Sequence, residues 1–398
     1  MTQDGGAAGP PLTGLRVLDL SRVLAGPYCT MLLADLGADV VKVEQPRSGD
    51  ETRGWGPPFA GGEATYFLAV NRGKRSVALD LKDPGDQAAA RALAARSDVV
   101  IHNFRAGVSQ RLGLGYAELA ELRPGIVHCT ISGFGPGRSP HGRAGYDFVV
   151  QAESGLMSIT GPRPGPPSKV GVAVVDVLSG LHAAVGILAA LRRRDATGAG
   201  ADLEVTLLDS ALAGLINVAQ AALVTGEEAG RFGNAHPSIV PYEPFEAADG
   251  WIAVAAANDA LWRRLCEVLE RPELAADERF AANDSRVRHR DELVAVLAPA
   301  FRARPAREWL DRLDAAGVPA GKVRGVREAF QAAARAGEPA TVEVAHPTAG
   351  RIPLVRSPIR GAGVAPSPAP PPLLGQHTAE VLAELDLPVP DPSQEPRP

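Results

Sequence analysis

One acidic residue interrupts the most apolar passage of the chain. Asp176 stands between a β-branched run, 170–175, and an Ala- and Leu-rich stretch, 181–191, which is followed by three arginines. The two runs predict a short strand and a helix, with the aspartate at the helix start. A carboxylate at that place can be an N-cap that accepts free backbone N–H groups. It can also be a nucleophile, since the same N–H groups and the helix dipole would lower its pKa and keep it ionised.

The elements that must position this aspartate alternate between short apolar runs and helical stretches. We predict strands over 15–20, 39–44, 75–81, 98–104 and 126–134, and helices over 29–36, 84–96 and 116–122. Parallel strands joined by helices form a doubly wound sheet, in which ligands approach the carboxyl ends of the strands. The fold class is therefore α/β, with a Rossmann-like large domain built on a parallel sheet.

A nicotinamide-binding role is disfavoured by the loop after the first predicted strand. The loop reads SRVLAGPY, so it contains only Gly26, and Pro27 follows directly. The G-x-G-x-x-G pattern that lets a pyrophosphate approach the helix start is missing.

Composition and charge limit which other classes of function the chain can have. The chain has 398 residues, enough for two domains, and a net charge of −5 gives no reason to expect nucleic acid or an anionic membrane as a partner. The apolar runs fall short of the ~20 residues of a membrane span, and the N-terminus lacks secretory features, so we expect a cytoplasmic protein. Cys29, Cys129 and Cys266 are too far apart to predict a metal site or a disulfide framework.

The chain order suggests a discontinuous large domain with a small domain inserted into it. We expect the N-terminal part of the large domain over 12–205, a linker helix over 206–224, a small α+β domain over 225–330 and a C-terminal return to the large domain over 331–385. A hairpin with its turn at Asp249-Gly250 and charged helical patterns mark the small domain. The tails, 1–11 and 386–398, are expected to be disordered.

Several blocks carry a resemblance that covers most of the chain. They include GLRVLDLSRVLAGPYCTMLLADLGADVVKVE, NRGKRSVALDLK, VIHNFRAGVSQRLGLGY, AGYDFVVQAESG, GPPSKVGVAVVDVLSG and LLGQHTAEVL. In this order they resemble the class III CoA-transferases, a family that includes formyl-CoA transferase, carnitine CoA-transferase and the α-methylacyl-CoA racemases. The resemblance implies an interlocked homodimer, in which each chain threads through a ring formed by its partner.

The resemblance also implies a mechanism. A carboxylate at Asp176 would attack the thioester of an acyl-CoA, giving a mixed anhydride and then an aspartyl-CoA thioester that an incoming carboxylic acid opens. CoA thioesters are then substrates, and no permanently bound cofactor or metal is expected. Succinyl-CoA or another dicarboxylyl-CoA is one option for the donor, and the sequence leaves the acid pair open.

Other site residues follow from the family pattern by position. Basic side chains suit the phosphates of CoA, and Leu24 or Phe104 suits its adenine. The expected CoA-binding residues are Leu24, Ala25, Leu79, Lys82, Asn103, Phe104, Arg105, Arg111 and Phe134, and the expected substrate-lining residues are Tyr146 and His236. Gln45 and Ser132 stand where formyl-CoA transferase has an arginine and a lysine, so its CoA contacts do not transfer as a whole.

The sequence leaves two alternative functions to consider. A 2-methylacyl-CoA racemase needs a second proton carrier, but Tyr146 replaces the histidine of the racemases' GHD motif and Asn258 stands where they have a glutamate. These differences favour a transferase. A catalytically silent CoA-binding protein is disfavoured because Asp176 and the segment around it are retained.

Overall fold

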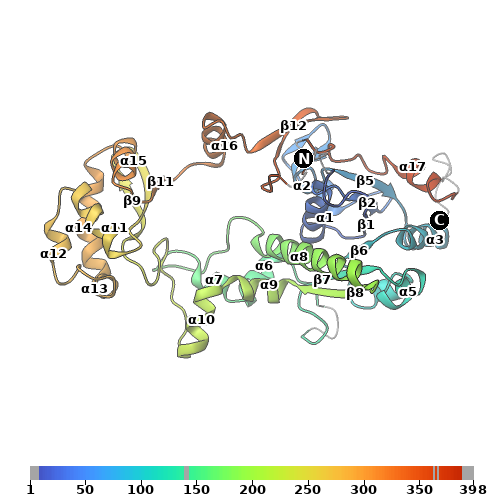
Figure 1. Ribbon diagram of the computed structural model, residues 1–398, viewed down its shortest axis with the longest axis horizontal. Coiled ribbons are helices and arrows are strands. Elements are labelled where there is room, and N and C mark those ends of the chain that lie inside the picture. The colour runs from blue at the N-terminus through green and yellow to red at the C-terminus, as the bar shows by residue number, and fades with distance from the viewer. Residues whose placement is uncertain (1–8, 139–142, 362–363, 365–366, 388–398) are drawn as a thin grey trace, which may run out of the picture. The chain divides into compact units, whose positions relative to one another are not determined.

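The computed structural model describes residues 9–138, 143–361, 364 and 367–387. The chain divides into two compact units, which are described one at a time (Figure 1). The first unit contains the chain up to residue 156, residues 170–220 and the chain from 339 onward. The second contains 157–169 and 221–338, so the short segment 157–169 groups apart from the rest of the predicted large-domain stretch, 12–205.

A six-stranded parallel sheet forms the centre of the first unit. Its strands lie in the order β5 (Lys74–Ala78), β2 (Asp39–Glu44), β1 (Arg16–Asp19), β6 (Val99–His102), β7 (Val127–Ser132) and β8 (Ala201–Thr206). Counted along the chain, this is the order 3-2-1-4-5-6 of a doubly wound fold. The predicted α/β class and parallel sheet are confirmed, and the strand order reverses between β1 and β6.

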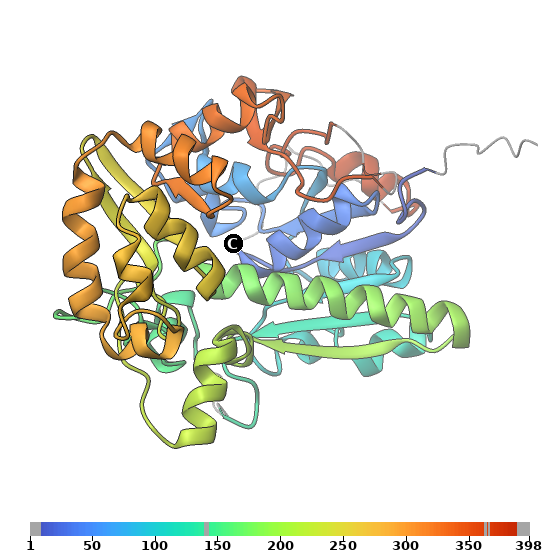
Figure 2. The same cartoon turned by 60° about the vertical axis from the view of Figure 1, so that its left-hand side comes forward.

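Helices cover both faces of this sheet because neighbouring residues of each strand point to opposite sides. Val17 of β1 lies in a core shared with α1 (Ala25–Asp35) and α8 (Val174–Thr197), while Leu18 lies in a core shared with other helices. Those helices are α3 (Pro84–Ala95), α5 (Tyr116–Leu122) and α17 (Thr378–Ala383). In Figures 1 and 2 the long helix α8 runs along the sheet beside α1.

Shorter elements complete the first unit. They are the 3-10 helix at Glu51–Gly54, α2 (Thr65–Val70), α4 (Val108–Arg111), α6 (Asp147–Glu153), α9 (Leu207–Gly214), and the paired strands β3 (Phe59–Ala60) with β4 (Glu63–Ala64) and β12 (Thr341–His346) with β13 (Gly350–Val355). Two helices, α7 (Leu156–Ile159) and α10 (Ile216–Thr225), contain the boundaries between the units.

The second unit packs helices on a three-stranded antiparallel sheet with the order β11 (Ala320–Lys322), β10 (Gly250–Ala255), β9 (Tyr242–Ala247). The helices are α11 (Asp259–Val268), α12 (Glu273–Ala276), α13 (Asn283–Arg288), α14 (Arg290–Arg302), α15 (Ala306–Ala315) and α16 (Val326–Arg335). Its aromatic core includes Trp262, Phe301 and Trp309. The β9–β10 hairpin turns where the sequence predicts it.

Two local predictions near the central aspartate are wrong. Residues 170–175 form no strand, because the run ends inside α8, which begins at Val174 and continues to Thr197. The last residues of the β-branched run are helical instead, because the apolar inner face of α8 packs on α1 and the sheet. The apolar stretch predicted as one linker helix is divided into α9 and α10, and the break falls at Ile216, where φ is +43°.

α8 is also long and apolar enough to cross a membrane, judged by its length and composition. The sequence prediction had counted only 181–191 of this helix. Half of its most apolar window is buried inside the protein, as in the core helix of a globular domain.

Candidate active site

A cavity of about 590 Å³ lies at the carboxyl ends of the strands in the first unit. Segments that follow β1, β6 and β7 line it, together with Asp176 from α8. β1 and β6 are the neighbours between which the strand order reverses, and loops diverge at such a point and leave a crevice. The fold therefore places the central aspartate at the position where doubly wound sheets bind their ligands.

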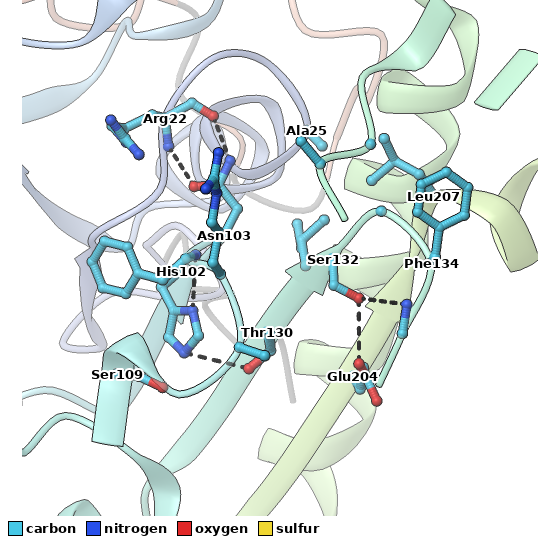
Figure 3. Close-up of a pocket in the computed structure, with 18 of the residues that line it drawn as sticks. Arg22, Ala25, His102, Asn103, Ser109, Thr130, Ser132, Phe134, Glu204 and Leu207 are labelled. Atoms are coloured by element: carbon cyan, nitrogen blue, oxygen red, sulfur yellow. Dashed lines mark hydrogen bonds between the residues drawn. The ribbon is translucent and has the colours of Figure 1, made fainter. Parts of the chain in front are cut away.

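The turn between β1 and α1 is fixed by two side chains from other strands. Asn103, just after β6, accepts the backbone N–H of Arg22 at 3.0 Å and donates to its carbonyl oxygen at 2.8 Å (Figure 3). The carboxylate of Asp50 accepts the N–H of Val23, whose φ of +72° is unusual for a β-branched residue. Asp50 in turn pairs with the fully buried Lys42 at 2.9 Å. A strained turn is thus held in one conformation at the cavity wall.

An aromatic pair forms another part of the wall. The rings of His102 and Phe104 stack with centroids 5.0 Å apart, and the imidazole faces the Thr130 hydroxyl at 3.4 Å (Figure 3). Burial, and secondarily the nearby His128, lowers the pKa of His102 to about 3. His102 is therefore neutral at physiological pH and supports the ring of Phe104 without adding charge.

The segment after β7 packs closely against the segment that leads to α6. A Cβ on Gly133 would lie 2.8 Å from the Cα of Gly145, so both positions require glycine. Next to this contact, the Ser132 hydroxyl donates to Glu204 at 3.3 Å and accepts the N–H of Gly135 at 3.2 Å (Figure 3). The close approach fixes the start of α6, where Tyr146 and Asp147 follow.

Asp176 is not the N-cap that one interpretation of the sequence suggested. It lies in the first turn of α8, while Ala173 occupies the cap position without a side-chain bond. The Oδ1 atom of Asp147 accepts the backbone N–H groups of Val175 at 2.8 Å and of Asp176 at 3.3 Å. No described residue donates a hydrogen bond to the carboxylate of Asp176. Asp147 thus takes the capping role, and the side chain of Asp176 is left facing the cavity.

The ionisation of Asp176 also differs from the expectation. Burial, followed by the negative charge of Asp147, raises the pKa of Asp176 to about 7, and only 8% of the residue is exposed. The expected lowering by N–H groups fails because Asp147 has taken those groups. The nearby Tyr66 of α2 has its pKa raised to about 12, by burial and then by the charge of Asp176. A carboxylate so placed is a stronger nucleophile than an ordinary aspartate, and about half of it is ionised at neutral pH.

Most of the predicted site residues meet at the cavity. Those that line it are Leu24, Ala25, Asn103, Phe104, Arg105, Phe134, Tyr146 and Asp176. Arg105 is exposed there, and its side chain pairs with no described residue, as suits a partner for phosphate.

Four predicted residues lie elsewhere. Leu79 is 1% exposed in the core beneath α3, and Lys82 and Arg111 are exposed without lining the cavity. His236 belongs to the second unit, where its ring lies 5.3 Å from that of Tyr242 and its Nδ1 accepts the N–H of Ser238 at 3.1 Å.

Three residues of the site were not picked from the sequence. Asp147 directly follows Tyr146 of the motif, and nothing in the local sequence shows that it caps a helix about thirty residues later. His102 lies in the predicted strand 98–104, and no element was predicted around Tyr66. Within the described residues, no group of His, Cys, Asp and Glu side chains could hold a metal ion.

The fold and site define a class: a doubly wound α/β protein with a buried carboxylate on its switch-point cavity. The chain belongs to the CoA-transferase family III, which it matches over residues 12–378. It is 43% identical to the succinyl-CoA:glutarate CoA-transferase of Mus musculus, over 94% of this chain and 86% of that protein. It is 42% identical to the succinate–glutarate CoA-transferase of Agrobacterium fabrum, over 95% and 96% of the two chains.

A solved structure agrees with this assignment. A CAIB/BAIF family protein from Brucella suis superposes with a TM-score of 0.84 and 39% identity, over 95% of this chain and all of that one. The predicted family and enzyme class are confirmed: the protein is a class III CoA-transferase, and CoA thioesters are its substrates.

Proposed function

We propose that Asp176 is the nucleophile of CoA transfer. A carboxylate oxygen of Asp176 attacks the carbonyl carbon of the donor thioester, the C–S bond breaks, and CoA leaves as the thiolate. The thiolate then attacks the Asp176 carbonyl of the mixed anhydride and releases the donor acid as its carboxylate. The acceptor carboxylate attacks the resulting aspartyl-CoA thioester and releases CoA thiolate, which leaves a second mixed anhydride. The thiolate then attacks the acceptor's acyl carbon in this anhydride, which forms the new acyl-CoA and regenerates the Asp176 carboxylate.

The observation that carries this proposal is the state of the Asp176 carboxylate. It faces a cavity large enough for part of a CoA molecule, it has no hydrogen-bond donor among the described residues, and its pKa is about 7. An aspartate that served only to cap a helix would show the reverse: bonds to N–H groups and a lowered pKa.

The test is covalent trapping. The enzyme is incubated with succinyl-CoA, treated with hydroxylamine, and digested for peptide mass mapping. We expect a hydroxamate at Asp176, and none in the Asp176→Asn variant. Glu121→Gln, which removes an exposed carboxylate from α5, is the matched control and should be labelled like the wild type. Labelling at another carboxylate, or none with any donor, would contradict the proposal.

We further propose that donor and acceptor are short dicarboxylic acids. Support comes from the two relatives, whose names specify succinyl-CoA or succinate with glutarate. The cavity walls also carry Arg105, whose side chain pairs with no described residue and which suits a second carboxylate or the CoA phosphates. Arg22 and Arg143 line the cavity too, but they are paired with Glu51 and Glu153. Glutarate should therefore be a better acceptor than pentanoate, which has the same chain length without the second carboxylate. Equal kcat/KM for both acids would refute the preference.

We also propose that the protein acts as a homodimer, interlocked as the resemblance implies. Large apolar side chains are exposed on three helices that contact one another, α6, α8 and α9. They include Phe148 at 57%, Val185 at 65% and Leu212 at 42% exposure. Large apolar side chains exposed on neighbouring helices are typical of a surface that contacts another chain.

Sedimentation gives the oligomeric state, and subunit exchange tests the threading. Two differently tagged preparations are mixed in the folded state; threaded chains should not exchange until they are unfolded together. A monomer in sedimentation would refute the dimer, and rapid exchange would refute the interlocked form.

A further inference from the structure

Asp147 contacts the segment that carries the nucleophile at more than one point. Its Oδ1 atom accepts the N–H groups of Val175 and Asp176, at 2.8 and 3.3 Å. Its Oδ2 atom accepts the side-chain N–H of Gln151, one turn later on α6, at 2.6 Å. Both oxygens of a carboxylate that is 8% exposed are thus engaged within the protein.

Gln151 extends this attachment toward the N-terminus of the same segment. The side chain is fully buried, and its Oε1 atom accepts the backbone N–H of Val170 at 2.9 Å. Two side chains on one face of α6 therefore hold the chain from Val170 to Asp176, which forms no strand or other ladder of its own. Without these two side chains, the backbone N–H groups at the start of α8 would have no side-chain acceptor, since Ala173 at the cap position offers none.

We propose that Asp147 is a positioning residue for the nucleophile: it caps the first turn of α8, and its charge, fixed beside Asp176, favours the covalent intermediates. The inference rests on the proposed role of Asp176 and adds to it a second carboxylate that never contacts the acyl group. It assigns to the aspartate of the Gly145-Tyr146-Asp147 motif a function separate from proton transfer.

The effect of the charge follows from the reaction steps. When an Asp176 oxygen bonds to the donor carbonyl and the thiolate leaves, the residue changes from a buried anion into a neutral anhydride, and later into a neutral thioester. Each conversion removes the repulsion between two buried carboxylates, so the repulsion destabilises free Asp176 and not the intermediates. Asp147 forms no covalent bond in any of these steps.

Few other charges act on this pair. Among the described residues, Asp147 is the charged group that shifts the pKa of Asp176, alongside burial. Tyr66 of α2 is a further titratable group near it, and it is neutral at physiological pH because its pKa is about 12. The packed surface of α1 meets α8 at Gly180, where a Cβ would touch the Ala25 carbonyl and the Tyr28 ring.

The test compares two variants that separate charge from hydrogen bonding. Asp147→Asn removes the charge and keeps an oxygen that accepts the N–H groups of Val175 and Asp176. Its side-chain NH2 group would, however, face the side-chain NH2 group of Gln151, so two donors would meet. Asp147→Asn combined with Gln151→Glu restores that bond, keeps an acceptor for Val170, and moves the charge farther from Asp176. The rate of hydroxylamine trapping from succinyl-CoA is measured against pH for both variants and the wild type.

In the wild type the rate should rise with pH through about 7, because the ionised form of Asp176 attacks. In Asp147→Asn the acidic limb should move to lower pH, on the order of one pH unit. In the double variant, which keeps a negative charge at a greater distance, it should move in the same direction by less, and trapping above the limb should be slower in both variants. If the single variant does not fold, the double variant carries the test.

The outcomes separate this inference from the proposed function. An acidic limb that stays in place in a folded variant would overturn the inference, since a purely structural cap would change stability alone. Absence of trapping in the wild type would instead overturn the role of Asp176.

Discussion

Replacing Asp176, the proposed nucleophile, should stabilise the protein, and the gain should depend on pH. The pKa of Asp176 is raised from 3.8 to about 7 in the folded chain. The folded state therefore holds a proton that the unfolded state has released between these values, and stability falls as pH rises through this window. About three pKa units at 1.36 kcal/mol each give an upper limit of about 4 kcal/mol above pH 7.

Asp176→Asn removes this penalty. No described residue donates a hydrogen bond to this side chain, so the buried amide costs about 1–2 kcal/mol, and we expect a net gain of about 2–3 kcal/mol at pH 8. Below about pH 4 both side chains are neutral, and the gain should vanish or reverse. Activity should be lost at every pH.

The assay is urea denaturation across this pH range, with hydrogen exchange of the α8 amides to report on the first unit alone. Glu121→Gln serves again as the exposed control and should give no gain at any pH. A stability difference between Asp176→Asn and the wild type that is equal at pH 5 and pH 8, or largest at low pH, would refute a buried carboxylate of raised pKa.

Two further predictions concern the elements around the site. Gly180→Ala would place a methyl group 2.7 Å from the Ala25 carbonyl, so α8 must move from α1, and we expect a loss of about 1–3 kcal/mol in urea denaturation and lower activity. Gly186→Ala, on the same helix with only an ordinary contact at 3.6 Å, should be neutral or stabilising by up to about 1 kcal/mol; equal losses in both variants would contradict the close packing. Asp50→Ala leaves Lys42 buried and unpaired and should cost about 3–5 kcal/mol, measured in the same way, whereas a neutral result would show that the pair does not hold the turn.

The sequence was sufficient for five of the six strands of the sheet, because burial on both faces makes each of these parallel strands a short apolar run. The predicted strand 39–44 matches β2 at both ends, and the predicted helix 116–122 matches α5. The edge strand β8 (Ala201–Thr206) was not predicted, because it is only partly buried and alternates polar with apolar residues. The cavity's location followed as well, because loops after neighbouring parallel strands meet at one edge.

The passage around Asp176 was harder to predict because its structure depends on a partner about thirty residues away. Val170 to Val175 has a strand-like composition, but the N–H groups of this segment bond to the side chains of Gln151 and Asp147 instead of to a neighbouring strand. No local pattern shows which of two aspartates will cap the helix. The predicted lowering of the pKa of Asp176 was wrong because burial, and then the charge of Asp147, raise it, and both depend on parts of the chain distant from Asp176.

If Asp176 is the nucleophile, as proposed, its apolar setting follows from the requirement that thioester energy be retained. Both covalent intermediates hydrolyse if water reaches them, and each hydrolysis wastes a donor molecule, so the carbon of Asp176 must be shielded. Shielding means burial, and burial raises the pKa of any carboxylate. Asp176 lies in the first turn of a long apolar helix, and the N–H groups of Val175 and Asp176 are already bound to Asp147. This placement provides both the shielding and the raised pKa. A cap taken by Asp176 itself would have given a better-solvated and weaker nucleophile. The loss of stability above pH 7 is therefore a direct consequence of the chemistry, and a variant that recovers that stability should lose the reaction.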